Sequence, residues 1–235
     1  MKHTIRHTLA LLLCTLGFSS ASAQIGELYH NISLGVNGGA TFNTVSFQPS
    51  VKQNMLIGAT GGITFRFISE KYFAMICGLQ IELNYTQKGW QQRFELPNGE
   101  KDKSLGYRRD MNYIELPFLA HLAFGKKVQV FLNAGPQLGF LLNDKETFTG
   151  KLADDPKLQE KREEYHKKID NSFDYGITAG LGVEFRTRRA GHFLVEGRYY
   201  YGLSDFFSNT KRDYFGRSAH GTIAAKFTYL FDLHK

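Results

Sequence analysis

Apolar and polar residues alternate along two long runs between Asn112 and Leu142. The apolar positions are Ile114, Leu116, Phe118, Ala120, Leu122 and Phe124 in the first run, and Val128, Val130, Leu132, Ala134, Leu138, Phe140 and Leu142 in the second. A period of two places alternate side chains on opposite faces of a β-strand. Because only Gly125-Lys126-Lys127 joins the runs, they predict a hairpin. Each arm of this hairpin is longer than the roughly five or six residues that are usual for strands of soluble proteins. The arms are long enough for a transmembrane barrel, whose strands need roughly 9–11 residues to cross the bilayer.

The same alternation predicts six more strands, at residues 29–42, 55–67, 72–87, 173–187, 193–203 and 218–233. The connections after the first, third, fifth and seventh strands are long and polar, and the other connections take a few residues each. Bacterial outer-membrane barrels join their strands in this alternating way. The pattern therefore predicts an all-β fold, an eight-stranded antiparallel up-and-down transmembrane β-barrel with long extracellular loops and short periplasmic turns.

A soluble lipocalin-like barrel is the alternative fold, and it would turn its apolar face inward around a ligand. It gives no reason for an even succession of long and short connections. The membrane barrel is therefore favoured. We expect the long connections outside the cell, so that protease cuts intact cells near Lys161 or Arg162 and spares Lys126 and Arg188.

The stretch NYIELPFLAHLAF at 112–124 resembles the strand signature of the PorT-type outer-membrane β-barrel proteins, also called a porin family. Tyr113, Glu115 and Pro117 carry the motif, and the stretches GLQIELNYTQKG at 78–89 and VEGRYYYGLSDF at 195–206 are also similar to that family. The resemblance spans about residues 28–233. It implies an outer-membrane barrel and implies little about activity.

The first 23 residues have the layout of a Sec signal peptide. A basic segment precedes an apolar run from Leu9 to Phe18, and Ala21-Ser22-Ala23 follows. This arrangement predicts cleavage before Gln24, which leaves residues 24–235 as one outer-membrane barrel domain. Cleavage leaves Cys77 as the only cysteine, so no intrachain disulfide can form.

Charged residues recur on the polar face of the predicted strands, which would point into the lumen. They are Arg66, Glu82, Glu115, Glu184, Arg186, Glu196, Arg198 and Lys226. Buried charges must be paired, and an eight-stranded barrel is narrow enough for its own side chains to fill it. We therefore expect an ionic plug, in which Glu196 and Arg198 pair with neighbouring strands. A catalytic or proton-relay cluster and a small pore are the alternatives.

No pattern in the sequence predicts an enzyme or a cofactor. His121, His192 and His220 have no spacing that makes a nucleophile, a base and an orienting acid. There is no metal-ligand spacing, phosphate loop or dinucleotide fingerprint. Several aromatic residues lie near predicted strand ends, where we expect a girdle at the membrane interface. They are Trp90, Tyr107, Tyr199, Tyr200, Tyr201, Tyr214 and Phe215.

Two of the predicted loops contain sequence signals for local structure. Asn98-Gly99 is a hairpin turn signal within the polar stretch 88–109, and we expect this hairpin to extend the third and fourth strands beyond the membrane. Asp155-Pro156 resembles the start of a short surface helix, with a mobile loop as the alternative there. The formal charge of +7 does not indicate nucleic-acid binding, because the basic residues are scattered and form no stripe with stacking aromatics.

These observations predict a monomeric, integral protein of the outer membrane with a plugged lumen. Loops on a rigid scaffold are where binding residues usually lie. We expect a structural or surface-interaction barrel that contacts outer-membrane lipid and binds protein partners through its extracellular loops. The alternatives are a PorT-like accessory of protein secretion across the outer membrane, a lipid-modifying enzyme and a small pore.

Overall fold

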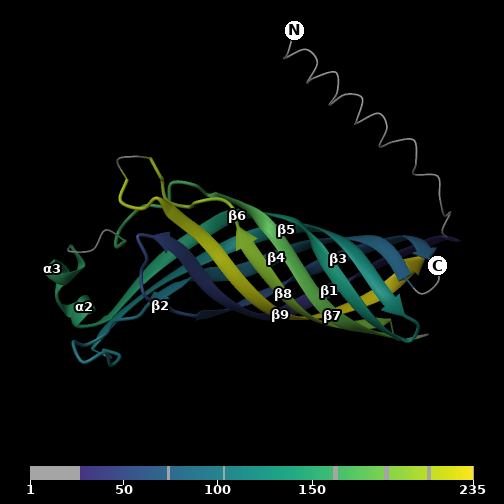
Figure 1. Cartoon of the computed structure of the whole chain (residues 1–235), viewed down its shortest axis with the longest axis horizontal. Helices are drawn as coiled ribbons and strands as arrows, with labels where there is room; N and C mark the ends of the chain where they lie inside the picture. Colours follow the sequence, from purple (N-terminus) through teal and green to yellow (C-terminus); the bar gives the residue numbers. More distant parts are fainter. Residues whose placement is uncertain are drawn as a thin grey trace, which may run out of the picture.

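Eight long strands account for most of the chain (Figure 1). The computed structural model describes residues 27–72, 75–102, 104–160, 164–187, 191–210 and 213–234, so the predicted signal peptide and its cleavage site at Gln24 lie outside the described residues. The long strands are β1 (Glu27–Gln48), β3 (Leu56–Tyr72), β4 (Met75–Gln92), β5 (Leu105–Gly125), β6 (Val128–Gly150), β7 (Phe173–Arg186), β8 (His192–Gly202) and β9 (Arg217–His234).

The long strands close into an antiparallel ring. Each strand pairs with the next one along the chain, and β9 returns to pair with β1. A two-residue strand, β2 (Gln53–Asn54), pairs with the end of β4. The predicted all-β antiparallel arrangement is confirmed, with β2 as an addition that the sequence pattern did not indicate. No helix in the described ranges is long and apolar enough to cross a bilayer.

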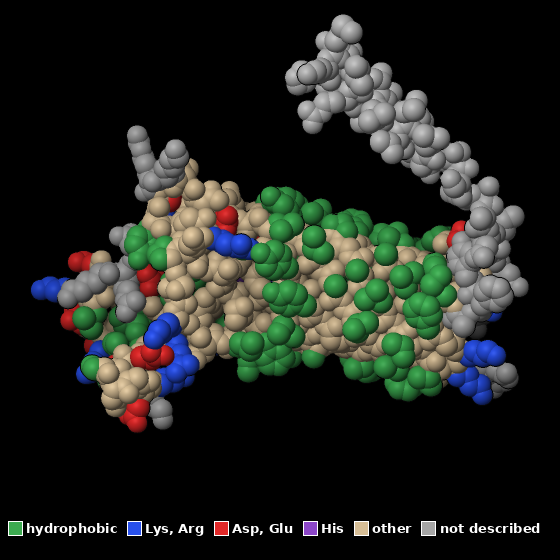
Figure 2. Space-filling view, in the orientation of Figure 1, with side chains coloured by type: hydrophobic (Ala, Val, Ile, Leu, Met, Phe, Trp, Pro, Cys, Tyr) green, Lys and Arg blue, Asp and Glu red, His purple; other side chains and the backbone are tan. Residues whose placement is uncertain are grey.

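Burial alternates along the strands, because successive side chains of a strand point to opposite faces. On β8, Glu196, Arg198 and Tyr200 are buried inside the ring, whereas Val195 and Tyr199 are exposed outside it. Figure 2 shows hydrophobic side chains spread over the outer surface and charged ones gathered toward the two ends. Monomeric soluble proteins rarely expose such large apolar areas. The predicted assignment of inward and outward faces is confirmed.

The two ends of the ring differ in their connections. Residues 49–55, 93–104, 151–172 and 203–216 connect the strands at one end, which we call the loop end. Residues 126–127 and 187–191 connect them at the other, the turn end. Figure 1 shows β2 and the helices at the loop end and the C-terminus at the turn end. The predicted alternation of long and short connections is present.

Strands β4, β5 and β6 run past the apolar belt toward the loop end. The extension of β4 and β5 agrees with the one predicted for the strands beside Asn98-Gly99, whereas β6 is longer than predicted. The second arm of the predicted hairpin ends at Leu142, whereas β6 continues to Gly150 and has 23 residues, and β5 has 21. A single membrane crossing needs roughly 9–11 residues. The pairing of Arg109 with Glu146 and of Leu105 with Gly150 continues the ladder. Polar residues occupy both faces of this part of β6, so an apolar-polar period could not reveal it.

The loop connections contain a turn and two short helices. Gly99 has a φ of 83°, and a bridge joins Glu95 to Lys101, which confirms the predicted turn at Asn98-Gly99. The helices are α2 (Lys151–Asp154) and α3 (Pro156–Gln159). The Asp155 carboxylate accepts a 3.0 Å hydrogen bond from the Lys157 amide and caps α3, so the predicted helix start is confirmed.

Candidate functional site

The interior of the ring is filled by successive groups of side chains, and the predicted lumen charges belong to three of these groups. An apolar cluster lies toward the turn end. It consists of six residues from six different strands: Ile68, Ile76, Ala123, Phe131, Leu194 and Leu230. The three ionic groups follow from here toward the loop end.

The turn-side ionic group is built on Glu184 of β7. Arg66 of β3 donates two hydrogen bonds to this carboxylate, of 2.6 and 3.0 Å, and both side chains are only 1% exposed. Arg186 Nε lies 3.1 Å from Glu184 Oε1. His192 Nδ1 lies 2.8 Å from the same oxygen, and its Nε2 lies 3.0 Å from Asp232. Arg66, Glu184 and Arg186 were predicted lumen residues, whereas His192 and Asp232 were not assigned to the ionic plug.

The central ionic group crosses the lumen. Arg198 of β8 donates hydrogen bonds of 2.9 and 2.8 Å to Glu82 of β4, and one of 2.8 Å to Glu196 on its own strand. Lys226 of β9 lies 2.5 Å from Glu82 as well. Arg198 thus binds Glu82, one of the partners expected for it, but β4 is not a neighbour of β8 in the ring, and Glu196 binds Arg198 on its own strand. The lumen is narrow enough for long side chains to reach the far wall instead.

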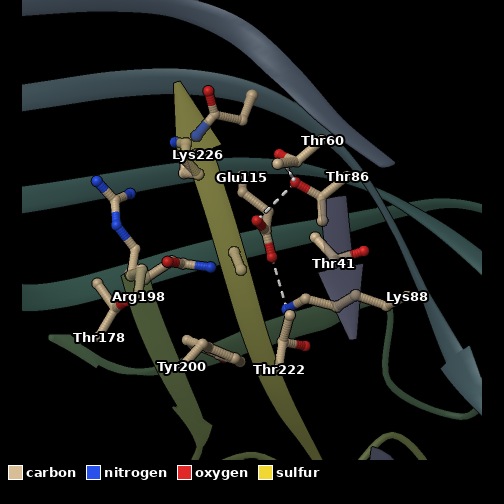
Figure 3. Close-up of a pocket in the computed structure, with 13 residues that line it drawn as sticks. Thr41, Thr60, Thr86, Lys88, Glu115, Thr178, Arg198, Tyr200, Thr222 and Lys226 are labelled. Atoms are coloured by element: carbon tan, nitrogen blue, oxygen red, sulfur yellow. Dashed lines mark hydrogen bonds and ion pairs between the residues drawn. The ribbon is translucent and has the colours of Figure 1, made fainter. Parts of the chain in front are cut away.

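The loop-side ionic group surrounds Lys88, which lies at the end of β4. Its ammonium lies 2.6 Å from Glu115 and 3.0 Å from Asp174, and 4.0 Å from the centre of the Tyr200 ring. Figure 3 shows Lys88 reaching toward Glu115, which also accepts a 2.8 Å hydrogen bond from Thr86. The sequence prediction assigned Lys88 to a loop, although Glu82, Asn84 and Thr86 indicate the same parity.

A small cavity lies between the central and loop-side groups. Its volume is about 30 Å³, and threonine hydroxyls form much of its wall, together with Lys88, Glu115, Arg198 and Lys226 (Figure 3). A cavity of this size holds water but no larger solute.

The three motif residues of β5 all face the interior. Tyr113 is fully buried, and its hydroxyl lies 3.1 Å from Nε2 of His220. Glu115 binds Lys88, and Pro117 is buried opposite Gln137. The motif therefore contributes to the packing of the lumen.

An aromatic cluster fills the loop end above the ionic groups. Its members include Phe47, Trp90, Tyr107, Phe206, Phe207 and Phe215. The rings of Trp90 and Phe206 stack with their centroids 5.6 Å apart. Arg109 closes over this cluster, 5.7 Å from the Trp90 ring, and forms ion pairs with Asp144 and Glu146.

The predicted aromatic girdle at the membrane interface is wrong for four of its seven residues. Trp90, Tyr107, Tyr200 and Phe215 are buried inside the ring, so they cannot contact lipid. Tyr199, Tyr201 and Tyr214 are exposed, as a girdle requires. The difference arises because β4 and β5 continue past the apolar belt, and the interior of that extension needs its own apolar filling.

A cleft opens among the loop-end connections. Its volume is about 740 Å³, and its wall includes Lys52, Arg93, Glu95, Glu164 and Tyr214. Lys52 forms an ion pair with Glu95, and Arg93 Nε lies 3.2 Å from the same carboxylate. Nearby, hydrogen bonds from Thr210 and Ser208 hold the pKa of the Asp213 carboxyl below its usual range.

The described histidines do not form a nucleophile and base pair. Ser33 donates a 2.8 Å hydrogen bond to Oδ1 of Asp232, and His192 Nε2 lies 3.0 Å from the same oxygen. The hydroxyl and the imidazole thus both bind the acid, whereas catalysis of this kind places the imidazole between the hydroxyl and the acid. Within the described ranges, no group of three or more His, Cys, Asp or Glu side chains could hold a metal ion.

Comparisons with known proteins agree with this architecture. The chain matches the family described as outer membrane protein β-barrel domain over residues 18–208. A comparison with curated proteins gave no match.

Several solved structures are similar at low identity. Ail, the attachment invasion locus protein of Yersinia pestis, is 14% identical with a TM-score of 0.36, covering 86% of this chain and 100% of that chain. Neisserial surface protein A is 13% identical with a TM-score of 0.39, covering 84% and 97%. OprG from Pseudomonas aeruginosa is 9% identical with a TM-score of 0.46, covering 88% and 98%.

The family match includes every strand of the ring except β9, which pairs with β1 and completes the closure. Because the match extends over most of the sequence, the chain belongs to the outer membrane protein β-barrel domain family.

Proposed function

We propose that this protein is a closed outer-membrane barrel with a plugged lumen, which acts as a structural or surface-interaction barrel through its loop end. The filled interior supports the proposal. Ion pairs such as Arg66–Glu184 and Arg198–Glu82 link opposite parts of the wall, and the cavity between the central and loop-side groups has a volume of only about 30 Å³. Open aqueous channels belong to barrels of about sixteen strands or more.

Planar-bilayer recordings of the purified protein test the plug. The expected result is the absence of large, steady conductance, because ionic groups and the aromatic cluster occupy the interior of the described ring. Arg198→Ala is the matched variant, since it empties part of the central group and is expected to admit small ions at most. Steady nanosiemens-scale conductance of the unaltered protein would overturn the proposed plug.

The loop-end cleft is where we propose that protein partners bind. It combines the exposed Tyr214 ring with charges at Lys52 and Arg93, and aromatic and arginine side chains are enriched in protein interfaces. Crosslinking in isolated outer membranes tests this role. A Lys52→Glu and Arg93→Glu double variant should lose a crosslinked partner that the turn-end control Lys126→Glu keeps. Equal crosslinking in all three proteins would contradict the assignment.

We further propose that the barrel has no catalytic role, which the arrangement of Ser33, Asp232 and His192 supports. The PorT-type assignment and a part in protein secretion stay predictions. The packing of Tyr113, Glu115 and Pro117 accounts for that motif without a secretion role, and a secretion defect on deletion of the protein is the observation that would favour one.

A further inference from the structure

The outer surface of the ring carries an apolar groove across β6, β7, β8 and β9. Its volume is about 500 Å³, and it is lined by Leu132, Ala179, Leu181, Gly197, Tyr199 and Ile223. The small residues form its floor, because Gly197 pairs with Leu181 on one side and with Ala225 on the other. Leu181 and Tyr199 are 64% and 50% exposed, so larger side chains stand as walls beside that floor.

The floor of the groove is open above Gly197. A Cβ built on Gly197 would meet no other atom within 4 Å, so the hollow is not created by backbone crowding. In an outer-membrane barrel this outward face lies against lipid acyl chains, and a hollow between apolar walls increases the contact of one chain with the protein. The groove therefore has the chemistry and the surroundings of an acyl-chain site.

A cationic group lies at the loop-end side of this groove. A second hollow, of about 290 Å³, shares Tyr199 with the groove and is also lined by Tyr201 and Arg217. Arg217 donates a 2.5 Å hydrogen bond to the Tyr201 hydroxyl, and its guanidinium lies 5.4 Å from the centre of that ring. The described residues offer Arg217 no carboxylate partner, so its charge is available to an anion. Arginine binds phosphate through paired hydrogen bonds.

We propose that the groove and Arg217 together form a binding site for one phosphate-bearing membrane lipid whose headgroup has a net negative charge. An acyl chain lies over Gly197 between Leu181 and Tyr199, and the phosphate of the headgroup binds Arg217 beside Tyr201. The lipid belongs to the leaflet on the side of the long connections. The proposal rests on the outer-membrane location and does not depend on the plugged lumen.

Native mass spectrometry tests the site on the full chain, reconstituted in vesicles of phosphatidylcholine mixed with phosphatidylglycerol and then released into mild detergent. The unaltered protein should retain phosphatidylglycerol in preference to phosphatidylcholine. Arg217→Gln should reduce that preference about fivefold, the effect of one basic residue at a membrane surface, and Arg217→Lys should keep most of it. Gly197→Phe should reduce retention of both lipids about tenfold, because excluding about two methylenes has that effect.

The matched control is Gly38→Phe on β1, an outward-facing position outside the groove where a Cβ would meet only ordinary contacts. It should retain lipid like the unaltered protein, and a circular dichroism spectrum should show that all variants fold. The proposal is overturned if the unaltered protein retains no lipid, or if Gly38→Phe and Gly197→Phe lose it equally. It is also overturned if inorganic phosphate displaces the lipid, or if Gly197→Phe removes a second copy of the chain in place of a lipid.

Discussion

Arg198 joins two carboxylates that lie on opposite parts of the barrel wall, since it contacts Glu82 and Glu196 while only 6% of its side chain is exposed. Arg198→Ala leaves Glu82 with the Lys226 ammonium and leaves Glu196 with a hydrogen bond from the Asn133 amide. Loss of one partner from a buried pair costs about 3–5 kcal/mol, so urea unfolding in lipid should show a drop of that size. Arg108→Ala is the control, because Arg108 forms an exposed pair with Asp110 worth about 0–1 kcal/mol. Equal effects would mean that water screens Arg198.

Phe118 tests the outward face at the same scale. It lies opposite Ile81 on β4, within the apolar row of β5. Phe118→Arg should lower the free energy of unfolding in bilayers by about 2–4 kcal/mol, the cost of arginine near the bilayer midplane. Thr149→Arg, exposed at the loop end of β6, should change it by no more than about 0.5 kcal/mol. A Phe118→Arg protein as stable as this control would reverse the assigned faces.

At the scale of the elements, labelling of the connections tests which end of the barrel faces the outside of the cell. With Cys77 replaced by alanine, a cysteine at Asn98 should react with a membrane-impermeant maleimide on intact cells, because Asn98 lies in a loop-end turn. A cysteine at Lys126 should react only after the outer membrane is permeabilised. The opposite pattern would place the loop end in the periplasm. The protease sites first expected at Lys161, Arg162 and Arg188 lie outside the described residues.

The sequence predicts the strands within the apolar belt and the extension of β4 and β5 beside the Asn98-Gly99 turn, but it does not predict the extension of β6. Ile114 to Phe124 of β5 alternate between lipid and lumen, and this contrast creates a period of two. Near Arg109 and Glu146 the outer face meets water, so both faces of β6 are polar and the period disappears. For the same reason, the sequence pattern places Lys88 in a loop and several residues of the aromatic cluster in a membrane girdle. Ion pairs across the lumen, such as Arg198 with Glu82, depend on the diameter of the ring, which no local pattern encodes.

At the scale of the whole molecule, the ring is much longer than its membrane-spanning part. The 23 residues of β6, at roughly 3.3 Å each, exceed what a tilted crossing of an apolar band about 25 Å tall requires. The ionic groups fill the part inside the apolar belt, and the aromatic cluster fills the part beyond it. We therefore expect the loop-end connections to stand beyond the apolar belt on this extension.

Trp90 reports on that extension because it is the only tryptophan of the chain and is fully buried in the aromatic cluster. Its fluorescence in bilayers should be quenched only weakly by brominated phospholipid, since the β-sheet wall separates the indole from the acyl chains. A Trp90→Phe and Tyr199→Trp double variant moves the reporter to the outer face, where the side chain is exposed, and it should be quenched strongly. Strong quenching of Trp90 itself would place the aromatic cluster at the membrane interface. The part of the barrel above the bilayer would then be shorter by the height of that cluster.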